Sequence, residues 1–142
     1  MTASDLTVFI VDDDASVRDA LALSLSVRGY RTAVFANAKD FLSTWHPDRT
    51  GCLLLDIRMP DMDGLSLQQH LTDLGSTLPV IIITGHGDVE SVRTAFKARA
   101  IDYLEKPLKA ERLISAIDDA FKVQAAAQAL SAERESAARL LS

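Results

Sequence analysis

Apolar residues occur along the chain in short blocks that alternate with helical patterns. Continuous apolar runs at 8–11, 52–55 and 80–83 predict strands that are buried on both faces, as in parallel sheets. Shorter patterns predict two more strands, at 31–35, which is expected at an edge, and at 101–104. Helices are predicted at 15–28, 38–45, 64–74, 89–98 and 110–121.

The alternation of strand and helix predicts one class of fold. It indicates a doubly wound α/β domain with a five-stranded parallel sheet, right-handed crossovers and helices on both faces. In such folds, binding sites form at the carboxyl ends of the strands. Polar signals stand at four of these ends: Asp12-Asp13-Asp14, Asp56, Thr84-Gly85 and Lys106-Pro107. The sequence therefore predicts that carboxylates, a hydroxyl and one ammonium group meet at one edge of the sheet.

The composition changes after Phe121. Residues 122–142 are rich in alanine and show no strand pattern, which predicts a helix because alanine is the best helix former. We therefore assign a domain to residues 1–125 and a helical segment to residues 126–142. Two interpretations of that segment stay open, a frayed C-terminal helix or a linker into a second domain.

Composition and charge narrow the function. The chain has 142 residues, 48% hydrophobic and 25% charged, which is typical of one globular domain. Its net charge of −5 disfavours nucleic-acid binding by this segment, because a phosphate backbone would be repelled. Cys52, the single cysteine, is expected to be buried, and an unpaired cysteine is typical of the reducing cytosol. No apolar run approaches the ~18 residues of a membrane span, so we expect a cytoplasmic protein without membrane contact.

Three adjacent carboxylates follow the first predicted strand. Like charges about 4 Å apart repel by roughly 1 kcal/mol in water and by more in a partly dry site, so a bound cation is favoured. The donors are oxygens with no cysteine nearby, and Mg²⁺ is the best candidate because it accepts one or two carboxylates together with phosphate oxygens. Capping of the next helix needs only one carboxylate, which we assign to Asp14. Asp12 and Asp13 remain as candidate metal ligands.

The other polar strand ends carry groups suited to phosphoryl chemistry. A carboxylate at a strand tip beside a metal, such as Asp56, is a candidate nucleophile for phosphoryl transfer, although a lone aspartate there equally suits a turn. The Thr84 hydroxyl can bond a phosphoryl oxygen, and Lys106 offers a point positive charge. A strand-end threonine and a solvated surface lysine are the simpler alternatives. The Lys106–Pro107 bond is a candidate cis peptide, which would direct the ammonium toward the sheet edge.

Four stretches of the chain together resemble the receiver domain of bacterial two-component response regulators. They are Val11-Asp12-Asp13-Asp14, Leu55-Asp56-Ile57-Arg58-Met59-Pro60-Asp61-Met62-Asp63-Gly64, Thr84-Gly85-His86-Gly87-Asp88 and Asp102-Tyr103-Leu104-Glu105-Lys106-Pro107. The resemblance covers about residues 5–125. It implies the flavodoxin-like receiver fold with strand order 2-1-3-4-5. It also implies a phosphorylation switch, with self-catalysed phosphotransfer and autodephosphorylation in place of enzymatic turnover.

The resemblance assigns roles to the acidic residues. It implies that Asp56 accepts a phosphoryl group from a phosphohistidine of a sensor histidine kinase. Asp13 and Asp56 would bind Mg²⁺ directly, together with the backbone carbonyl of Arg58. Asp12 would contribute through a water molecule, and Mn²⁺ would substitute for Mg²⁺.

The same resemblance implies a switch that responds to the phosphate. Thr84 matches the switch hydroxyl, and Lys106 matches the lysine that pairs with the phosphate. Tyr103 matches the aromatic residue that turns inward when the hydroxyl moves. Phosphorylation is then expected to bias a two-state surface, the face of the fourth helix, fifth strand and fifth helix, and to join two chains through it.

The stretch 84–88 looks most like regulators that carry a LuxR-type helix-turn-helix output domain. Residues 130–141 are similar to the first helix of that domain, so DNA would be bound only through an output domain that this chain lacks. Two residues depart from the family pattern. Arg99 stands where glycine is usual, and Leu108 stands where phenylalanine is commoner. Neither departure touches the acceptor site.

Two other functions fit parts of the pattern. Asp12-x-Asp14 resembles the nucleophile pair of haloacid-dehalogenase phosphohydrolases, but that interpretation leaves Asp56 without a role. A phosphate-independent interaction domain is the second alternative. Receivers of that kind usually lack part of the acceptor set, whereas this chain carries Asp12, Asp13, Asp56, Thr84 and Lys106.

Overall fold

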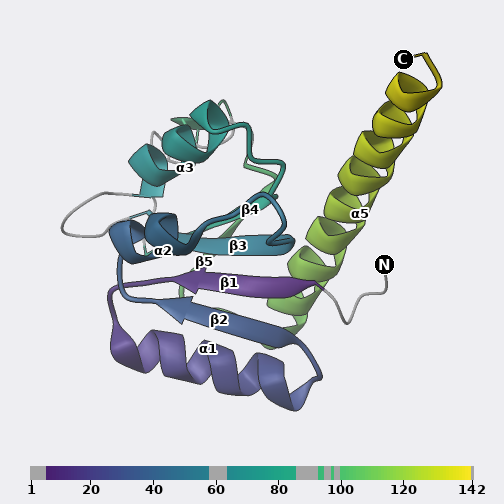
Figure 1. Cartoon of the computed structure of the whole chain (residues 1–142). Helices are drawn as coiled ribbons and strands as arrows, with labels where there is room; N and C mark the ends of the chain where they lie inside the picture. Colours follow the sequence, from purple (N-terminus) through teal and green to yellow (C-terminus); the bar gives the residue numbers. More distant parts are fainter. Residues whose placement is uncertain (1–5, 58–63, 86–92, 95–96, 98–99, 142) are drawn as a thin grey trace.

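A five-stranded parallel sheet forms the centre of the molecule, with strand order β2-β1-β3-β4-β5 (Figure 1). The computed structural model describes residues 6–57, 64–85, 93–94, 97 and 100–141. The strands are β1 (Thr7–Val11), β2 (Arg31–Phe35), β3 (Gly51–Asp56), β4 (Val80–Thr84) and β5 (Asp102–Glu105). The predicted fold class and strand order are confirmed.

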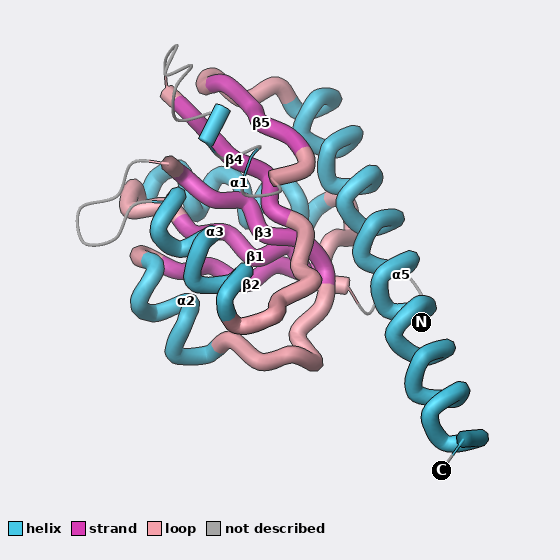
Figure 2. Tube along the Cα trace, turned by 90° about the horizontal axis from the view of Figure 1, so that it is seen from above, coloured by secondary structure: helices cyan, strands magenta, loops and turns pink. Residues whose placement is uncertain are grey.

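Helices cover both faces of the sheet (Figure 2). They are α1 (Ala15–Val27), α2 (Ala38–Thr44), α3 (Gly64–Asp73) and α5 (Ala110–Leu141). α1 and α5 pack on one face, and α2 and α3 pack on the other. The predicted helix 89–98 lies largely outside the described residues, of which residues 93, 94 and 97 are helical.

Side chains alternate along the strands and form two hydrophobic cores. On β1, Val8 and Ile10 point into the core beneath α1 and α5, whereas Phe9 and Val11 point into the core beneath α2 and α3. A central strand between two helical layers must therefore be apolar at nearly every position. This is why the continuous apolar runs predicted the strands. Cys52 is fully buried as expected, and burial raises the pKa of its thiol.

Capping residues define where the helices begin and end. Asp14 accepts hydrogen bonds from two amides in the first turn of α1, and Asn37 accepts one in the first turn of α2. Gly29 follows α1 with φ of +89°, a left-handed conformation that favours glycine. The bounds of most strands differ from the predicted bounds by one residue at an end, because the hydrogen-bonded ladder continues past the apolar run. One result is that Asp56 is the last residue of β3.

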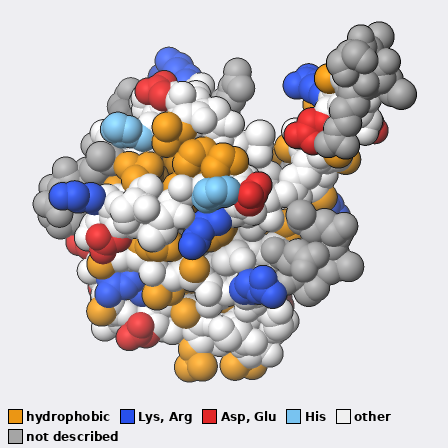
Figure 3. All heavy atoms as spheres, viewed as in Figure 1, with side chains coloured by type: hydrophobic (Ala, Val, Ile, Leu, Met, Phe, Trp, Pro, Cys, Tyr) orange, Lys and Arg blue, Asp and Glu red, His pale blue; other side chains and the backbone are white. Residues whose placement is uncertain are grey.

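The outer side of α1 is more apolar than its position suggests. Leu21 and Leu25 face the core, as the helical repeat predicts. Leu23 and Val27 lie on the opposite side and are 68% and 76% exposed. Figure 3 shows hydrophobic side chains at the lower margin of the molecule, where α1 lies. The repeat therefore identified the buried side of this helix but not the nature of its exposed side.

α5 is one continuous helix of 32 residues. Its first part packs on the sheet, and Gln124 is the last buried side chain in the described part of the helix. Residues 129–138 are exposed on every side, so the end of α5 projects from the body as an arm (Figure 1). The composition change after Phe121 lies close to the point where the helix leaves the body. Within the described residues, no helix is both long and apolar enough to cross a membrane.

Candidate functional site

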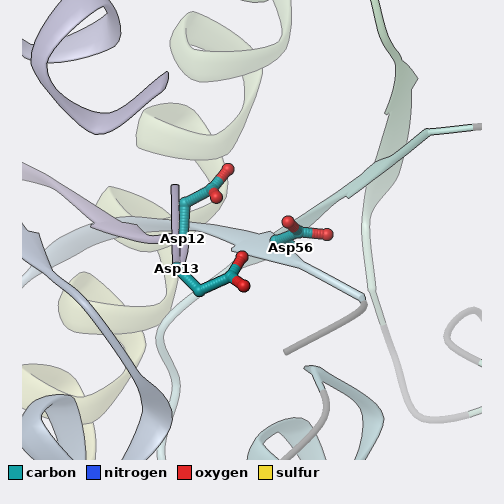
Figure 4. A group of neighbouring side chains, drawn as sticks. All are labelled: Asp12, Asp13 and Asp56. Atoms are coloured by element: carbon teal, nitrogen blue, oxygen red, sulfur yellow. The ribbon is translucent and has the colours of Figure 1, made fainter. Parts of the chain in front are cut away.

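Three carboxylates meet at the carboxyl edge of the sheet (Figure 4). Asp12 and Asp13 directly follow β1, and Asp56 ends β3, the neighbouring strand. Oxygens from the three side chains lie within 4.8 Å of one another. Asp12 and Asp56 are buried, with 1% and 7% exposure, whereas Asp13 is exposed. The structure thus assembles the acidic pocket, defined here as Asp12, Asp13 and Asp56, with one member open to solvent.

Hydrogen bonds within the turn after β1, and to β2 and α1, hold this turn in place. The Asp12 amide donates to the carbonyl of Phe35 in β2 at 3.2 Å. Asp12 Oδ1 accepts a hydrogen bond from the Asp14 amide at 2.9 Å, and the guanidinium of Arg18 donates to the Asp12 carbonyl oxygen at 2.7 Å. Asp14 caps α1, as predicted, and is not part of the pocket.

Arg18 is a residue of this site that the sequence analysis did not identify. It stands in the first turn of α1, one helical turn after the acidic residues. A cation in the first turn faces the positive end of the helix dipole, which is unfavourable by about 0.3–1 kcal/mol. An arginine at this place is therefore a signal for a specific acceptor nearby, and the Asp12 carbonyl is that acceptor.

Lys106 brings its ammonium group to the pocket from the loop that follows β5. Its Nζ lies 3.4 Å from Asp56 Oδ2 and 3.6 Å from Asp12 Oδ2. The Lys106–Pro107 peptide bond is cis, as predicted. The alternative of a solvated surface lysine is excluded, because the side chain is only 31% exposed and pairs with two carboxylates.

The electrostatics of the pocket follow from burial and crowding. Burial raises the pKa of Asp12, and the neighbouring carboxylates of Asp56 and Asp13 add to the rise. The hydrogen bond from the Asp14 amide and the charge of Lys106 oppose it. For Lys106, burial alone would lower the pKa, but the carboxylates of Asp56 and Asp12 outweigh burial and raise it. The ammonium is therefore held in its charged form.

Thr84 and Tyr103 lie on the two strands nearest to Lys106. Thr84 ends β4 and is buried at 5% exposure, and its carbonyl accepts a hydrogen bond from the Lys106 amide at 2.8 Å. Tyr103 lies on β5 with 43% exposure, so its side chain is largely outside the core. Thr84 stands at the carboxyl end of its strand, as the sequence predicts, whereas Tyr103 is the second residue of β5 and pairs with Ile82 of β4.

Some predicted residues cannot be compared with the structure. Arg58, with its backbone carbonyl, and Arg99, which replaces the usual glycine, lie outside the described residues. Leu108, the other departure from the family pattern, packs partly buried against the core beneath α1 and α5. The leucine side chain is thus accommodated at the edge of this core.

The donor set fits a hard divalent cation. Every candidate ligand in the acidic pocket is a carboxylate oxygen, which Mg²⁺ and similar ions prefer. Asp12 Oδ2 is buried and accepts no hydrogen bond from any described residue. A buried carboxylate oxygen normally has a partner, so this atom suits a bound cation or its water.

Parallel strands that carry an acidic pocket and a lysine at their carboxyl ends define a class of α/β signalling domain. A family model for the response regulator receiver domain matches residues 8–118. The chain belongs to this family. It is a receiver domain, a signalling module of response regulators of the FixJ and TodT type.

Individual members of the family are similar to this chain in sequence and in structure. It is 42% identical to the response regulator protein TmoT of Ectopseudomonas mendocina over 123 residues, which cover 87% of this chain and 56% of TmoT. It is 43% identical to the transcriptional regulatory protein FixJ of Rhizobium meliloti (strain 1021) over 126 residues, 89% of this chain and 62% of FixJ. The low-resolution structure of the response regulator StyR superposes with a TM-score of 0.90 at 38% identity, covering 95% of this chain and 68% of StyR. The chain thus spans little more than half the length of its curated relatives.

Proposed function

We propose that this receiver domain is a phosphorylation switch in which Asp56 accepts a phosphoryl group from a sensor histidine kinase. The observation that supports this most directly is the convergence of three carboxylates with the Lys106 ammonium, 3.4 Å from Asp56. Phosphoryl transfer needs positioning and charge neutralisation more than covalent chemistry from the protein. The pocket supplies a nucleophile, a cation-binding set and a fixed positive charge.

Each residue has a distinct part in the transfer. An oxygen of Asp56 forms the new O–P bond while the N–P bond of the phosphohistidine breaks and the imidazole leaves. Asp13 and Asp56, with the carbonyl of Arg58 and with Asp12 through water, are the residues that would hold Mg²⁺ or Mn²⁺. When bound, the ion neutralises charge on the phosphoryl oxygens. The Lys106 ammonium pairs with one of these oxygens, and attack by water later removes the phosphoryl group from Asp56.

The phosphate is then sensed by Thr84 and Tyr103. The Thr84 hydroxyl would donate to a phosphoryl oxygen on Asp56, and Tyr103 would move from its exposed position toward the space that the hydroxyl leaves. The exposed position of Tyr103 fits a side chain that can move in this way. A two-state surface formed by β5, α5 and the region 89–98 would respond to this movement.

The output of the switch is proposed to be transcriptional. Two of the relatives are described as a response regulator and a transcriptional regulatory protein, and both are longer than this chain. The arm of α5 is a suitable connection from the receiver domain, residues 1–125, through a helical linker, residues 126–142, to a DNA-binding output domain. The kinase encounter and the switch are expected in the cytoplasm.

Phosphorylation of matched variants tests the acceptor assignment. The protein is incubated with Mg²⁺ and acetyl phosphate, or with beryllofluoride as a phosphoryl analogue, and the intact mass or analogue binding is measured. Asp56→Asn is expected to abolish modification. Asp14→Asn is the matched control, because asparagine caps a helix as well as aspartate, and it is expected to react like the wild type. Modification of the Asp56→Asn variant would show that another residue accepts the phosphoryl group. Sustained hydrolysis of a phosphate ester by the wild type would favour the alternative function of a phosphohydrolase.

The proposed dimer has its own measurement. Light scattering is expected to show a monomer without beryllofluoride and a dimer with it, because the analogue stabilises the switched state of the surface. A protein that stays monomeric at high concentration with beryllofluoride would contradict the dimer without touching the assignment of Asp56.

A further inference from the structure

We propose that Arg18 is a positioning residue for the acidic pocket, and that its hydrogen bond to the Asp12 carbonyl strengthens the binding of Mg²⁺. The inference rests on the proposed function, because it assumes that the pocket binds this ion. Arg18 would touch neither the metal nor the phosphoryl group. It would act through the backbone between Asp12 and Asp13.

The contact itself is strong and specific. A guanidinium nitrogen of Arg18 lies 2.7 Å from the Asp12 carbonyl oxygen in a partly buried place. Charge-assisted hydrogen bonds of this length are stronger than neutral ones. The carbonyl belongs to the peptide unit that joins Asp12 to Asp13, so the bond holds this unit between two candidate metal ligands.

Other bonds hold the remaining polar groups of Asp12. Its amide donates to Phe35, and its Oδ1 accepts from Asp14. With the Arg18 bond, the amide, the carbonyl and one carboxylate oxygen of Asp12 all have partners. Only Oδ2, the atom nearest to Lys106, accepts no hydrogen bond from a described residue.

Asp13 depends on this arrangement. Its side chain is exposed, and no described residue donates a hydrogen bond to its carboxylate. The direction of the Asp13 side chain is therefore set mainly by the backbone that carries it. If Arg18 is removed, the peptide unit after Asp12 loses its partner and the Asp13 carboxylate samples more directions, which lowers the affinity for an ion.

The charge of Arg18 predicts the opposite effect on the affinity for Mg²⁺, so the two explanations can be told apart by experiment. A guanidinium near the pocket repels a dication. If Arg18 acted only through its charge, its removal would strengthen the binding of Mg²⁺. Weaker binding after removal therefore reports alignment of the ligands.

Three variants separate the two effects. Arg18→Met keeps an unbranched side chain of similar length but removes the charge and the donors. Arg18→Lys keeps the charge but replaces the planar guanidinium by an ammonium group, whose N–H donors sit on one nitrogen. Arg28→Met is the matched control, because Arg28 follows α1 and its guanidinium also donates to a backbone carbonyl, that of Ser24, at 3.0 Å.

Calorimetric titration with MgCl₂ gives the main readout. Arg18→Met is expected to bind Mg²⁺ about tenfold more weakly than the wild type, the usual effect of losing a residue that orients a metal ligand. Arg18→Lys is expected between the two, and Arg28→Met is expected to match the wild type. Binding by Arg18→Met that equals or exceeds that of the wild type would overturn the inference, as would equal weakening in Arg28→Met.

Hydrogen exchange without Mg²⁺ gives a readout that does not depend on the ion. The Asp14 amide, which donates to Asp12 Oδ1, is expected to exchange faster in Arg18→Met than in the wild type or in Arg28→Met. Unchanged exchange would overturn the positioning role even where Mg²⁺ binding differs. A wild-type protein that does not bind Mg²⁺ would instead refute the proposed function, while faster exchange in Arg18→Met would still show that Arg18 holds the turn.

Discussion

The ammonium nitrogen of Lys106 lies 3.4 Å from Asp56 Oδ2, although the two residues are 50 positions apart in the chain. The contact joins the end of β3 to the loop after β5, across the intervening strand β4. The same nitrogen lies 3.6 Å from Asp12 Oδ2. Lys106 is thus a shared counter-charge for two buried carboxylates that would otherwise repel each other.

Replacing Lys106 by methionine is expected to destabilise the metal-free protein by about 1–2 kcal/mol at neutral pH. Removal of one partner from a buried ion pair costs about 3–5 kcal/mol, and the partial exposure of Lys106 reduces this value. Urea unfolding measures the change. The loss is expected to shrink when Mg²⁺ is added, because the ion supplies the missing positive charge and binds only the folded state.

Lys109→Met is the control for this prediction. Lys109 is exposed and lies three residues further along the same loop, so its replacement removes one positive charge without uncovering a carboxylate. It is expected to change stability by less than about 0.5 kcal/mol. Equal destabilisation by the two variants would show that net charge, and not the contact with Asp56, explains the effect.

Asp12→Asn is expected to stabilise the metal-free protein at neutral pH while weakening the pocket as a cation site. Burial raises the folded pKa of Asp12 above its ordinary value of 3.8, so the folded state holds this proton more tightly than the unfolded state. That contribution is fully present below the ordinary pKa and is lost as the pH rises through the raised folded pKa. Above pH 4 the wild type therefore loses stability that the variant keeps. At neutral pH the variant is expected to be more stable than the wild type by about 1 kcal/mol. Urea unfolding as a function of pH measures the difference, and a less stable variant at pH 7 would contradict it.

The sequence predicts which residues form the acidic pocket because their approach follows from the topology of the sheet. The carboxyl ends of parallel strands meet at one edge, so apolar runs that end at Asp12, Asp56 and Thr84 were sufficient to bring these residues together. Lys106 followed by the same argument from β5. The structure brings the side chains of Asp12, Asp13, Asp56 and Lys106 together and gives their distances and burial.

Contacts that depend on side-chain direction could not be predicted in this way. Arg18 and Gln124 both lie on helices whose apolar repeat says which side faces the sheet, not which backbone group a long polar side chain meets. The continuous helix α5 was also only partly predicted. Alanine favours a helix beyond Phe121, but the point at which the helix leaves the body depends on packing around Gln124.

Gln124→Leu is expected to destabilise the protein by about 1–3 kcal/mol, because the buried amide of Gly51 loses its acceptor. Gln124 Oε1 accepts from the Gly51 amide at 3.1 Å, and Nε2 donates to the carbonyl and hydroxyl of Thr77 at 3.3 and 3.2 Å. The side chain thereby ties the start of β3 and the loop before β4 to α5. Chemical denaturation measures the loss.

Gln128→Leu is the matched control on the same helix, one turn later. No described residue donates a hydrogen bond to Gln128 Oε1, so leucine there removes no acceptor that a described residue uses. The change in stability is expected to stay within about 0.5 kcal/mol. If Gln128→Leu costs as much as Gln124→Leu, the hydrogen bonds of Gln124 do not explain its effect.

Tyr30→Phe is expected to remove a stabilising contribution that the wild type loses at alkaline pH. The Tyr30 hydroxyl donates to Asp118 Oδ1 at 2.6 Å, which joins the segment after α1 to α5. Burial, together with this hydrogen bond, raises the pKa of Tyr30 from 10.0 to about 12. The folded protein keeps the proton that the unfolded chain releases, so the contribution is full below pH 10 and disappears as the pH rises to about 12.

The Tyr30→Phe variant should be about 1 kcal/mol less stable than the wild type at pH 7, and the difference should narrow over this alkaline range in urea unfolding. Tyr103→Phe, which replaces the only other tyrosine, should retain the alkaline fall of the wild type. A stability difference between Tyr30→Phe and the wild type that stays constant from pH 7 to about 12 would show that the hydrogen bond to Asp118 does not hold the tyrosine proton.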